Sequence, residues 1–308
     1  MAGNFPEVWL HRVEQRLTSA DSAPWLAGIA ELDVPVTELG EGSDGESNII
    51  QIPTSDFEPD VLVNNTSYPI ATQAWTDATV PIALNKYQTK ATSITDDLAI
   101  GAAYDRIDAA TRSHVTAISK AKYARAIWGL APATNGAGST PVVEASGAGG
   151  GTGLRKKLIY EDLVALKREF DAMDCPAEGR RLVLCSEHLN DLLLDRQNFG
   201  NLLINYNEGK PLGRVAGFDI FDYVANPYYD KSTGARMAWG VAPGDNWRAS
   251  IAFYEGNVAL RTGMTKQYFA AAKDDPNNQV NLLNYRHYHI CLPKRNKYVG
   301  AIISKAQA

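Results

Sequence analysis

The chain has 308 residues, of which 45% are hydrophobic and 21% charged, a composition typical of a folded globular protein. Its formal net charge of -5 argues against sequence-specific binding of DNA or RNA, because proteins that grip phosphates usually carry a basic surface. The N-terminus lacks the apolar core of a signal peptide, and no run approaches the ~18 apolar residues of a membrane span. Three widely spaced cysteines indicate free thiols, so we expect a protein made in a reducing cytoplasm, without a membrane partner.

Residues 1–48 differ from the rest of the chain because prolines and a polar run at 40–48 interrupt regular structure. A short amphipathic helix is predicted from Pro6 to Leu17, with its apolar side chains on one side. Such a segment buries little of its own apolar surface, so we expect an arm that docks onto a partner. The residues expected to make that contact are Trp9, Leu10, Val13 and Leu17.

Residues 49–94 are rich in β-branched residues and are punctuated by prolines, which confine strands to edges or irregular positions. Extended pieces are expected at Val61–Val63 and at Val80–Thr92, where apolar residues partly alternate. The pattern predicts a long β-excursion, which a solitary protein has little reason to carry.

A long helix over residues 96–128 is the strongest local signal. Asp96 and Asp97 complement the positive end of the helix dipole, and Gly129 with Pro132 ends the helix. At about 1.5 Å per residue, this helix spans roughly 50 Å. Spacings of three and four predict one continuous face, made of Ile100, Tyr104, Ile107, Thr111, His114, Ile118 and Ala121.

Residues 133–153 are rich in glycine and serine, which predicts a pliable, exposed loop. The glycine run at 147–153 lacks the Lys-Ser/Thr pair that a phosphate-binding P-loop requires. We therefore expect a surface loop rather than a phosphate site.

Residues 154–243 combine helices and strands. One amphipathic helix is predicted from the spacing of Ile159, Leu163, Leu166, Phe170 and Met173. The further elements expected are a buried strand at Arg181–Cys185, a helix at Ser186–Leu194, and strands at Phe218–Val224 and Arg236–Val241.

Residues 246–308 are mainly extended. Periodicity does not settle the segment Asn257–Lys273. The strands expected around it are Ala249–Tyr254, Asn284–Leu292 and Val299–Ser304.

One constellation invites a metal-binding hypothesis. His287, His289 and Cys291 alternate along a predicted strand, so they project from one face, and two imidazoles with a thiolate suit zinc. Tyr285 shares that face, which favours an aromatic and sulfur core as the other interpretation. The acidic pair Asp274–Asp275 fits a turn before Pro276. Because neither a G-x-S-x-G elbow nor an H-E-x-x-H motif occurs, we expect no catalytic, cofactor-binding or metal-binding residue.

Five phrases of the sequence resemble a subgroup of phage capsid proteins. They are IPTSDFEPDVLVNNTSYPI at 52–70, KYQTKATSITDD at 86–97, RLVLCSEHLNDLLL at 181–194, GFDIFDYVANPYY at 217–229 and NLLNYRHYHICLPKRN at 281–296. With the order of parts, they make nearly the whole chain similar to the major capsid proteins of tailed bacteriophages, which share the Hong Kong 97 fold.

The resemblance implies an α+β fold of the Hong Kong 97 type, with an N-terminal arm, an extended β-loop, a long spine helix, a peripheral domain and an axial domain. The implied division is an arm at 1–48, an extended β-loop at 49–95, a peripheral domain with the spine helix at 96–154, an axial domain at 155–243, and a return to the peripheral domain at 244–308.

The function implied is structural, not enzymatic: self-assembly into the icosahedral head shell that encloses viral DNA. The partners expected are further copies in pentamers and hexamers, a portal, separate scaffolding or cement proteins, and packaged DNA in non-specific contact. The expected location is the virion, after assembly in the host bacterial cytoplasm.

Some members of that family cross-link their subunits through a lysine on the extended loop. Lys86 and Lys90 lie in the corresponding stretch, so we expect them at an assembly interface, but no cross-linking partner is identifiable. Two alternatives remain open. One is an encapsulin-type compartment with the same fold, and the other is a metal-dependent cytoplasmic enzyme that uses His287, His289 and Cys291.

Overall fold

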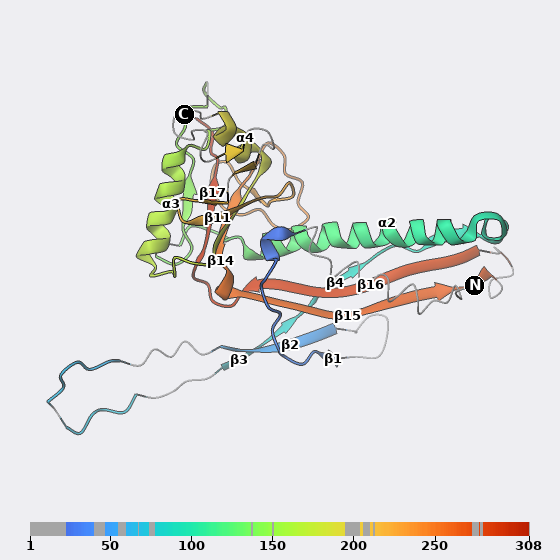
Figure 1. Ribbon diagram of the computed structural model, residues 1–308, viewed down its shortest axis with the longest axis horizontal. Helices are drawn as coiled ribbons and strands as arrows, with labels where there is room; N and C mark the ends of the chain where they lie inside the picture. Colours follow the sequence, from blue (N-terminus) through green and yellow to red (C-terminus); the bar gives the residue numbers. More distant parts are fainter. Residues whose placement is uncertain are drawn as a thin grey trace.

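The structure is a computed structural model that describes residues 23–39, 47–54, 60–66, 68–73, 78–136, 138–149, 151–194, 204–205, 210–211, 213–272, 277 and 280–307. The predicted contact residues of the arm, Trp9, Leu10, Val13 and Leu17, lie outside the described residues, as does the pair Asp274–Asp275. Figure 1 shows a long helix lying along one sheet, and a second sheet with shorter helices at one end of that helix.

Helix α2 runs from Asp96 to Leu130 and confirms the predicted long helix. Its 35 residues span roughly 50 Å. The predicted face is buried at Thr111, His114 and Ile118, but Ala121 is exposed. After Ile118 the stripe advances in steps of four, which moves it one position around the helix. Its further buried members are Ser119, Lys122, Tyr123, Ala126, Ile127 and Leu130.

Helix α2 packs on a four-stranded sheet centred on β15 (Val258–Ala270) and β16 (Val280–Pro293). Strands β4 (Asn85–Gln88) and β5 (Thr92–Thr95) pair, one after the other, with the second edge of β16. The segment that periodicity did not settle is therefore strand β15. The predicted strand at Asn284–Leu292 is confirmed and is longer at both ends.

Because side chains alternate along a strand, β16 has two different faces. Leu283 and Tyr285 pack against α2. Tyr288 and Ile290 face the opposite side, where they pack with Ile50 of the β-loop. Strand β16 thus forms the centre of a layered module with α2 on one side and the β-loop on the other.

A three-stranded antiparallel sheet joins β1 (Thr37–Leu39), which lies in the predicted arm, to β2 (Ser47–Thr54) and β3 (Ala78–Ala83) of the β-loop. Beyond β2 and β3, the chain at 60–73 projects away from the body (Figure 1). The extended piece predicted at Val61–Val63 is wrong, because the chain turns at residues 63–64. The piece predicted at Val80–Thr92 divides into β3 and β4.

A second sheet has six strands in the order β10-β11-β7-β14-β17-β6. They are β6 (Val142–Glu144), β7 (Arg180–Leu184), β10 (Arg214–Val215), β11 (Phe218–Asp222), β14 (Ser250–Tyr254) and β17 (Val299–Ile303). These bounds confirm the strands predicted near residues 181, 218, 249 and 299. Short ladders join β8 (Ile204–Asn205) to β9 (Lys210–Pro211) and β12 (Tyr228–Tyr229) to β13 (Trp247–Arg248).

Two predicted helices accompany this sheet. Helix α3 (Tyr160–Ala172) fully buries Leu163, Leu166 and Phe170, which confirms its predicted apolar face. Helix α4 spans Ser186–Leu194, as predicted.

The glycine-rich stretch at 133–153 is not the exposed, pliable loop that its composition predicts. Strand β6 lies within it and pairs in parallel with β17. Gly147 forms a bridge with Lys157, whose carbonyl oxygen lies 2.6 Å from where a Cβ of residue 147 would stand. Glycine is therefore required here for close packing, not for mobility.

The strand predicted at Arg236–Val241 is wrong. Only Arg236 pairs, in an isolated bridge with Tyr229, and the chain turns at Gly240, whose φ is +82°. The Arg236 guanidinium instead donates to the carbonyl oxygens of Trp128 and Ala131, at 2.6 and 2.5 Å, at the C-terminal end of α2. These bonds satisfy carbonyls that the end of a helix leaves without a partner.

Residues 23–36 were predicted as part of an arm that docks onto a partner, and the structure corrects this prediction. This segment begins with the short helix η2 (Pro24–Leu26) and packs on its own chain, because Trp25 is fully buried and Leu26 is nearly so. The division into arm, β-loop, peripheral and axial domains stays a prediction. The six-stranded sheet takes strands from three of the predicted segments: β6 from 96–154, β7, β10 and β11 from 155–243, and β14 and β17 from 244–308. In the described part of the chain, no helix has both the length and the apolar character to cross a membrane.

Candidate functional site

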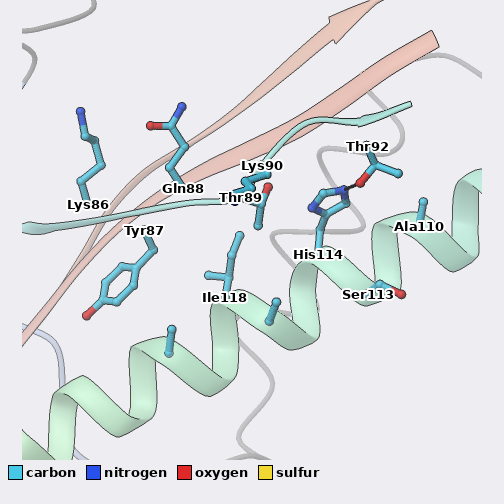
Figure 2. Close-up of a pocket in the computed structure, with 12 residues that line it drawn as sticks. Lys86, Tyr87, Gln88, Thr89, Lys90, Thr92, Ala110, Ser113, His114 and Ile118 are labelled. Carbon is cyan, nitrogen blue, oxygen red and sulfur yellow. Dashed lines mark hydrogen bonds between the residues drawn. The ribbon is translucent and has the colours of Figure 1, made fainter. Parts of the chain in front are cut away.

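A groove of about 650 Å³ lies between α2 and the edge formed by β4 and β5. We call it the α2–β4 groove. Figure 2 shows Tyr87 and Ile118 directed into it, and Lys86 and Gln88 directed away from α2 on the other face of β4. The residues that line it are Lys86, Tyr87, Gln88, Thr89, Lys90, Thr92, Ala110, Ser113, His114, Ala117, Ile118 and Ala121.

The small side chains of α2 create the depth of this groove. Ala110, Ala117 and Ala121 face β4 without filling the space between helix and strand. Burial raises the pKa of Tyr87 to about 12, with the Arg125 charge opposing the shift, so this phenol stays neutral at physiological pH. The floor of the groove is therefore apolar and uncharged.

A break in the edge strand positions the polar end of the groove. Thr89 follows β4, and its backbone N–H donates to the carbonyl of Tyr285 at 3.1 Å. The Thr89 hydroxyl accepts from the Tyr285 N–H at 3.1 Å, which replaces a ladder bond between the strands. Beyond the break, Thr92 Oγ1 and His114 Nε2 lie 3.0 Å apart and tie β5 to α2 (Figure 2).

The predicted interface residues Lys86 and Lys90 both line this groove and are both exposed. The structure therefore places both lysines on the rim of one apolar groove, with the Lys86 side chain on the outer face of β4 (Figure 2). Such a rim suits a segment that carries acidic and apolar side chains. The floor of the groove was not predicted as part of a site. The many alanines of residues 96–128 could have indicated it, because small side chains let another element approach α2 closely.

The projecting part of the β-loop, residues 60–73, exposes its apolar side chains. Val61 is 81% exposed, Val63 79% and Tyr68 77%. The Asp60 N–H donates to Gln73 Oε1 at 3.0 Å and joins the two limbs of the projection. Clustered exposed apolar side chains mark interaction surfaces, because water contact with them is unfavourable.

His287, His289 and Cys291 do share one face of β16, as predicted. All three are buried, and the two imidazole rings are stacked with their centroids 6.4 Å apart. His287 Nδ1 lies 3.0 Å from the Thr265 hydroxyl. Burial, and then the Lys122 charge, lowers the pKa of His287 to about 3. Among the described residues, no three His, Cys, Asp or Glu side chains are grouped as metal ligands.

Comparison with known proteins adds a family and a fold. Residues 76–303 match the family described as phage capsid protein. The capsid of cyanophage P-SCSP1u is similar in structure, with a TM-score of 0.56 and 16% identity over 92% of both chains. The capsid of an empty GTA particle has a TM-score of 0.59 and 12% identity, over 94% of this chain and 97% of that chain. For the Ralstonia phage GP4 capsid, the TM-score is 0.60 and the identity 8%, over 84% of each chain.

At these identities, the structural likeness shows the fold alone, and it confirms the predicted α+β fold of the Hong Kong 97 type. No curated protein matches the chain significantly in sequence.

Proposed function

Because this chain belongs to the phage capsid protein family, we propose that its copies assemble into the closed icosahedral head shell that encloses the DNA of a tailed bacterial virus. The copies form rings of five and six, and the β-loop and the part of the arm before residue 23 lie across neighbouring copies. The protein acts through geometry and not through catalysis.

The observation that carries this proposal is the projecting β-loop. An isolated subunit leaves Val61, Leu62, Val63, Tyr68 and Ile70 between 53% and 81% exposed on one thin projection. Contact with a neighbouring copy removes this apolar surface from water and stabilises the assembly. An elongated projection also reaches a neighbour more readily than a compact surface does.

The α2–β4 groove supplies a matching acceptor on the neighbouring copy. Its floor is apolar, and its rim carries Lys86 and Lys90. The tip of the β-loop combines exposed apolar residues with the exposed Asp60. Opposite charges at the rim favour one register of docking over others.

We assign the parts of the subunit as the resemblance implies: an arm at 1–48, a β-loop at 49–95, a peripheral domain at 96–154 with 244–308, and an axial domain at 155–243. The further partners proposed are a portal, separate scaffolding or cement proteins, and packaged DNA. Contact with DNA is weak and non-specific, since the formal net charge is -5. Assembly takes place in the host bacterial cytoplasm.

Paired serine substitutions test the role of the loop. V61S/L62S removes two apolar side chains from the projection, and L154S/V164S removes the same two residue types from exposed positions outside it. We expect both variants to melt like the wild type, because the substituted side chains are exposed. Only V61S/L62S should leave soluble subunits in place of shells, as seen by sedimentation and electron microscopy.

Regular shells from V61S/L62S would contradict the role of the loop. A wild-type protein that stays a monomer under all assembly conditions would contradict the proposed function itself.

A further inference from the structure

Residues 23–36, which we call the strap, wrap around the free edge of the sheet under α2. Its first part lies on the α2 side, where Trp25 packs in one core cluster with Tyr123 and Phe253. Its last part lies on the opposite face, where Val34 and Val36 pack against the cluster that contains Tyr288 and Ile290. Figure 1 shows the strap descending from α2 past β15 and β16 toward β1.

The upper attachment of the strap is a clamp made by Arg181 of β7. Its Nη1 donates to the carbonyl oxygens of Trp25 and Ala27, at 2.9 and 2.7 Å. Its Nη2 pairs with Glu255 at 2.6 Å, which orients the guanidinium. Directly after these carbonyls, Gly28 has a φ of +80° and turns the chain away from the clamp.

The Trp25 side chain is the apolar half of the clamp. It is fully buried, and its ring meets Tyr223 and Phe253 edge to face, with centroid distances of 5.7 and 6.3 Å. The clamp therefore holds the strap by backbone and side chain together. The clamp draws on three parts of the six-stranded sheet: the arginine comes from β7, Phe253 comes from β14, and Tyr223 follows β11.

The lower attachment is made by β15. The Leu32 N–H donates to the Leu260 carbonyl at 2.8 Å, and Arg261 Nη1 donates to the Leu32 carbonyl at 2.8 Å. The Glu31 carboxylate accepts from the hydroxyl of Thr262 at 2.5 Å and from its N–H at 3.2 Å. These bonds cover part of the β15 edge, which has no other strand beside it in the described sheet.

Apart from the three residues of η2, the strap has no regular structure between Ala23 and β1. Its path is therefore set by its contacts with the body rather than by hydrogen bonds within the strap. The strap leads into β1 and from there to the β-loop, so whatever holds the strap also sets the direction from which the chain enters the β-loop.

We propose that Arg181 is a positioning residue for assembly, which fixes the start of the strap at residues 23–27 in a constant relation to the β-loop. This inference rests on the proposed function, since it assigns Arg181 a part in shell geometry. Arg181 acts through the strap and touches no neighbouring copy itself.

Arg180 provides a matched control on the same strand. It is also buried, and it donates to the carbonyls of Pro176 and Cys175, at 2.8 and 2.5 Å, and pairs with Asp171 at 2.7 Å. Because neighbouring residues of a strand point to opposite faces, its contacts stay near the end of α3 and do not reach the strap. R180Q and R181Q thus remove the same kinds of bond from different places.

The test uses full-length protein and a glutamate-specific protease, with the cut after Glu31 followed by mass spectrometry. We expect R181Q to accelerate this cut by at least about tenfold, because loss of the clamp promotes local opening of the strap. R180Q should lower the melting temperature but leave the strap protected. Particles of R181Q should be irregular in size under the electron microscope, whereas those of R180Q should be regular.

Wild-type cleavage rates in R181Q, or regular particles with a cleaved strap, would overturn the inference. If R181Q does not fold, R181K replaces it, because a lysine keeps the positive charge beside Glu255 but lacks the fork that reaches two strap carbonyls and the carboxylate together. Wild-type protection of the strap in R181K then overturns the clamp. Absence of shells from the wild type would refute the proposed function, and the protease comparison would still decide the clamp.

Discussion

Three histidines that are almost completely buried make the stability of the isolated subunit depend strongly on pH. His188, His287 and His289 are each at most 2% exposed. Burial, followed by the Arg155 charge, lowers the pKa of His188 to about 3, and burial followed by the Lys122 charge does the same for His287. The pKa of His289 is also lowered well below 6.5, for the same reasons and through His287.

The hydrogen bonds of His188 show why its neutral form is preferred. The Cys185 N–H donates to Ser250 Oγ at 3.1 Å, so the Ser250 hydroxyl is free to donate to His188 Nδ1 at 2.7 Å. His188 Nε2 then donates to Ser304 Oγ at 3.0 Å. A proton on Nδ1 would leave the Ser250 hydroxyl without its acceptor. Because His188 is fully buried, the lost hydrogen bond would not be replaced by bulk water.

The sign and size of the effect follow from proton linkage. The unfolded chain takes up protons below pH ~6.5, whereas the folded chain does not until the pH approaches its lowered pKa values. Stability is therefore complete above pH 6.5 and is lost as the pH falls toward about 3. Three such groups give a slope of about 4 kcal/mol per pH unit, or about 6 kcal/mol between pH 7 and pH 5.

Urea unfolding of subunits at pH 7, 6 and 5 measures this slope. The variant H287Q/H289Q removes two of the three groups, so its slope should fall to about one third of the wild-type slope. A free energy of unfolding that is constant between pH 7 and pH 5, or a slope that the double substitution leaves unchanged, would refute the reasoning.

Two further predictions follow from buried groups. R236Q should lower the free energy of unfolding by about 3 kcal/mol in urea titrations. The substitution removes two charged hydrogen bonds to the end of α2 and a guanidinium stacked 3.8 Å from the Trp128 ring. A decrease in the free energy of unfolding below about 0.5 kcal/mol would contradict this prediction. Burial raises the pKa of the Cys185 and Cys291 thiols to about 11 and about 12, and that of Cys175 less, so native subunits should resist thiol reagents at pH 8. Rapid labelling before unfolding would contradict this burial.

The elements that could be predicted are those whose signal is local. Helix α2 is an uninterrupted periodic run that ends at Leu130, two residues before Pro132, and α3 shows a clean apolar face. Strand β15 escaped prediction because its burial is mixed along its length, so no simple alternation marks it. The strand predicted at 236–241 was wrong because Arg236 bonds to the end of α2 and the residues after it, rather than extending a strand ladder. Its N–H donates to the Ala133 carbonyl, and its guanidinium donates to the carbonyls of Trp128 and Ala131.

The functional surfaces depend on contacts that are distant in sequence. Lys86 and Lys90 were predicted at an interface from a family resemblance, but the groove also needs a face of α2. The contact between Arg181 and Trp25 joins residues 156 positions apart, which no local pattern of either segment indicates. The glycine content of residues 133–153 led to the wrong prediction of an exposed, pliable loop. At Gly147 the glycine instead permits a close approach of two backbone segments.

Electron microscopy of the purified wild-type protein tests the central claim most directly. The account predicts closed icosahedral particles in which residues 60–73 of each copy lie against a neighbouring copy. A stable monomer of 33.5 kDa, or particles in which this loop contacts no neighbour, would contradict it.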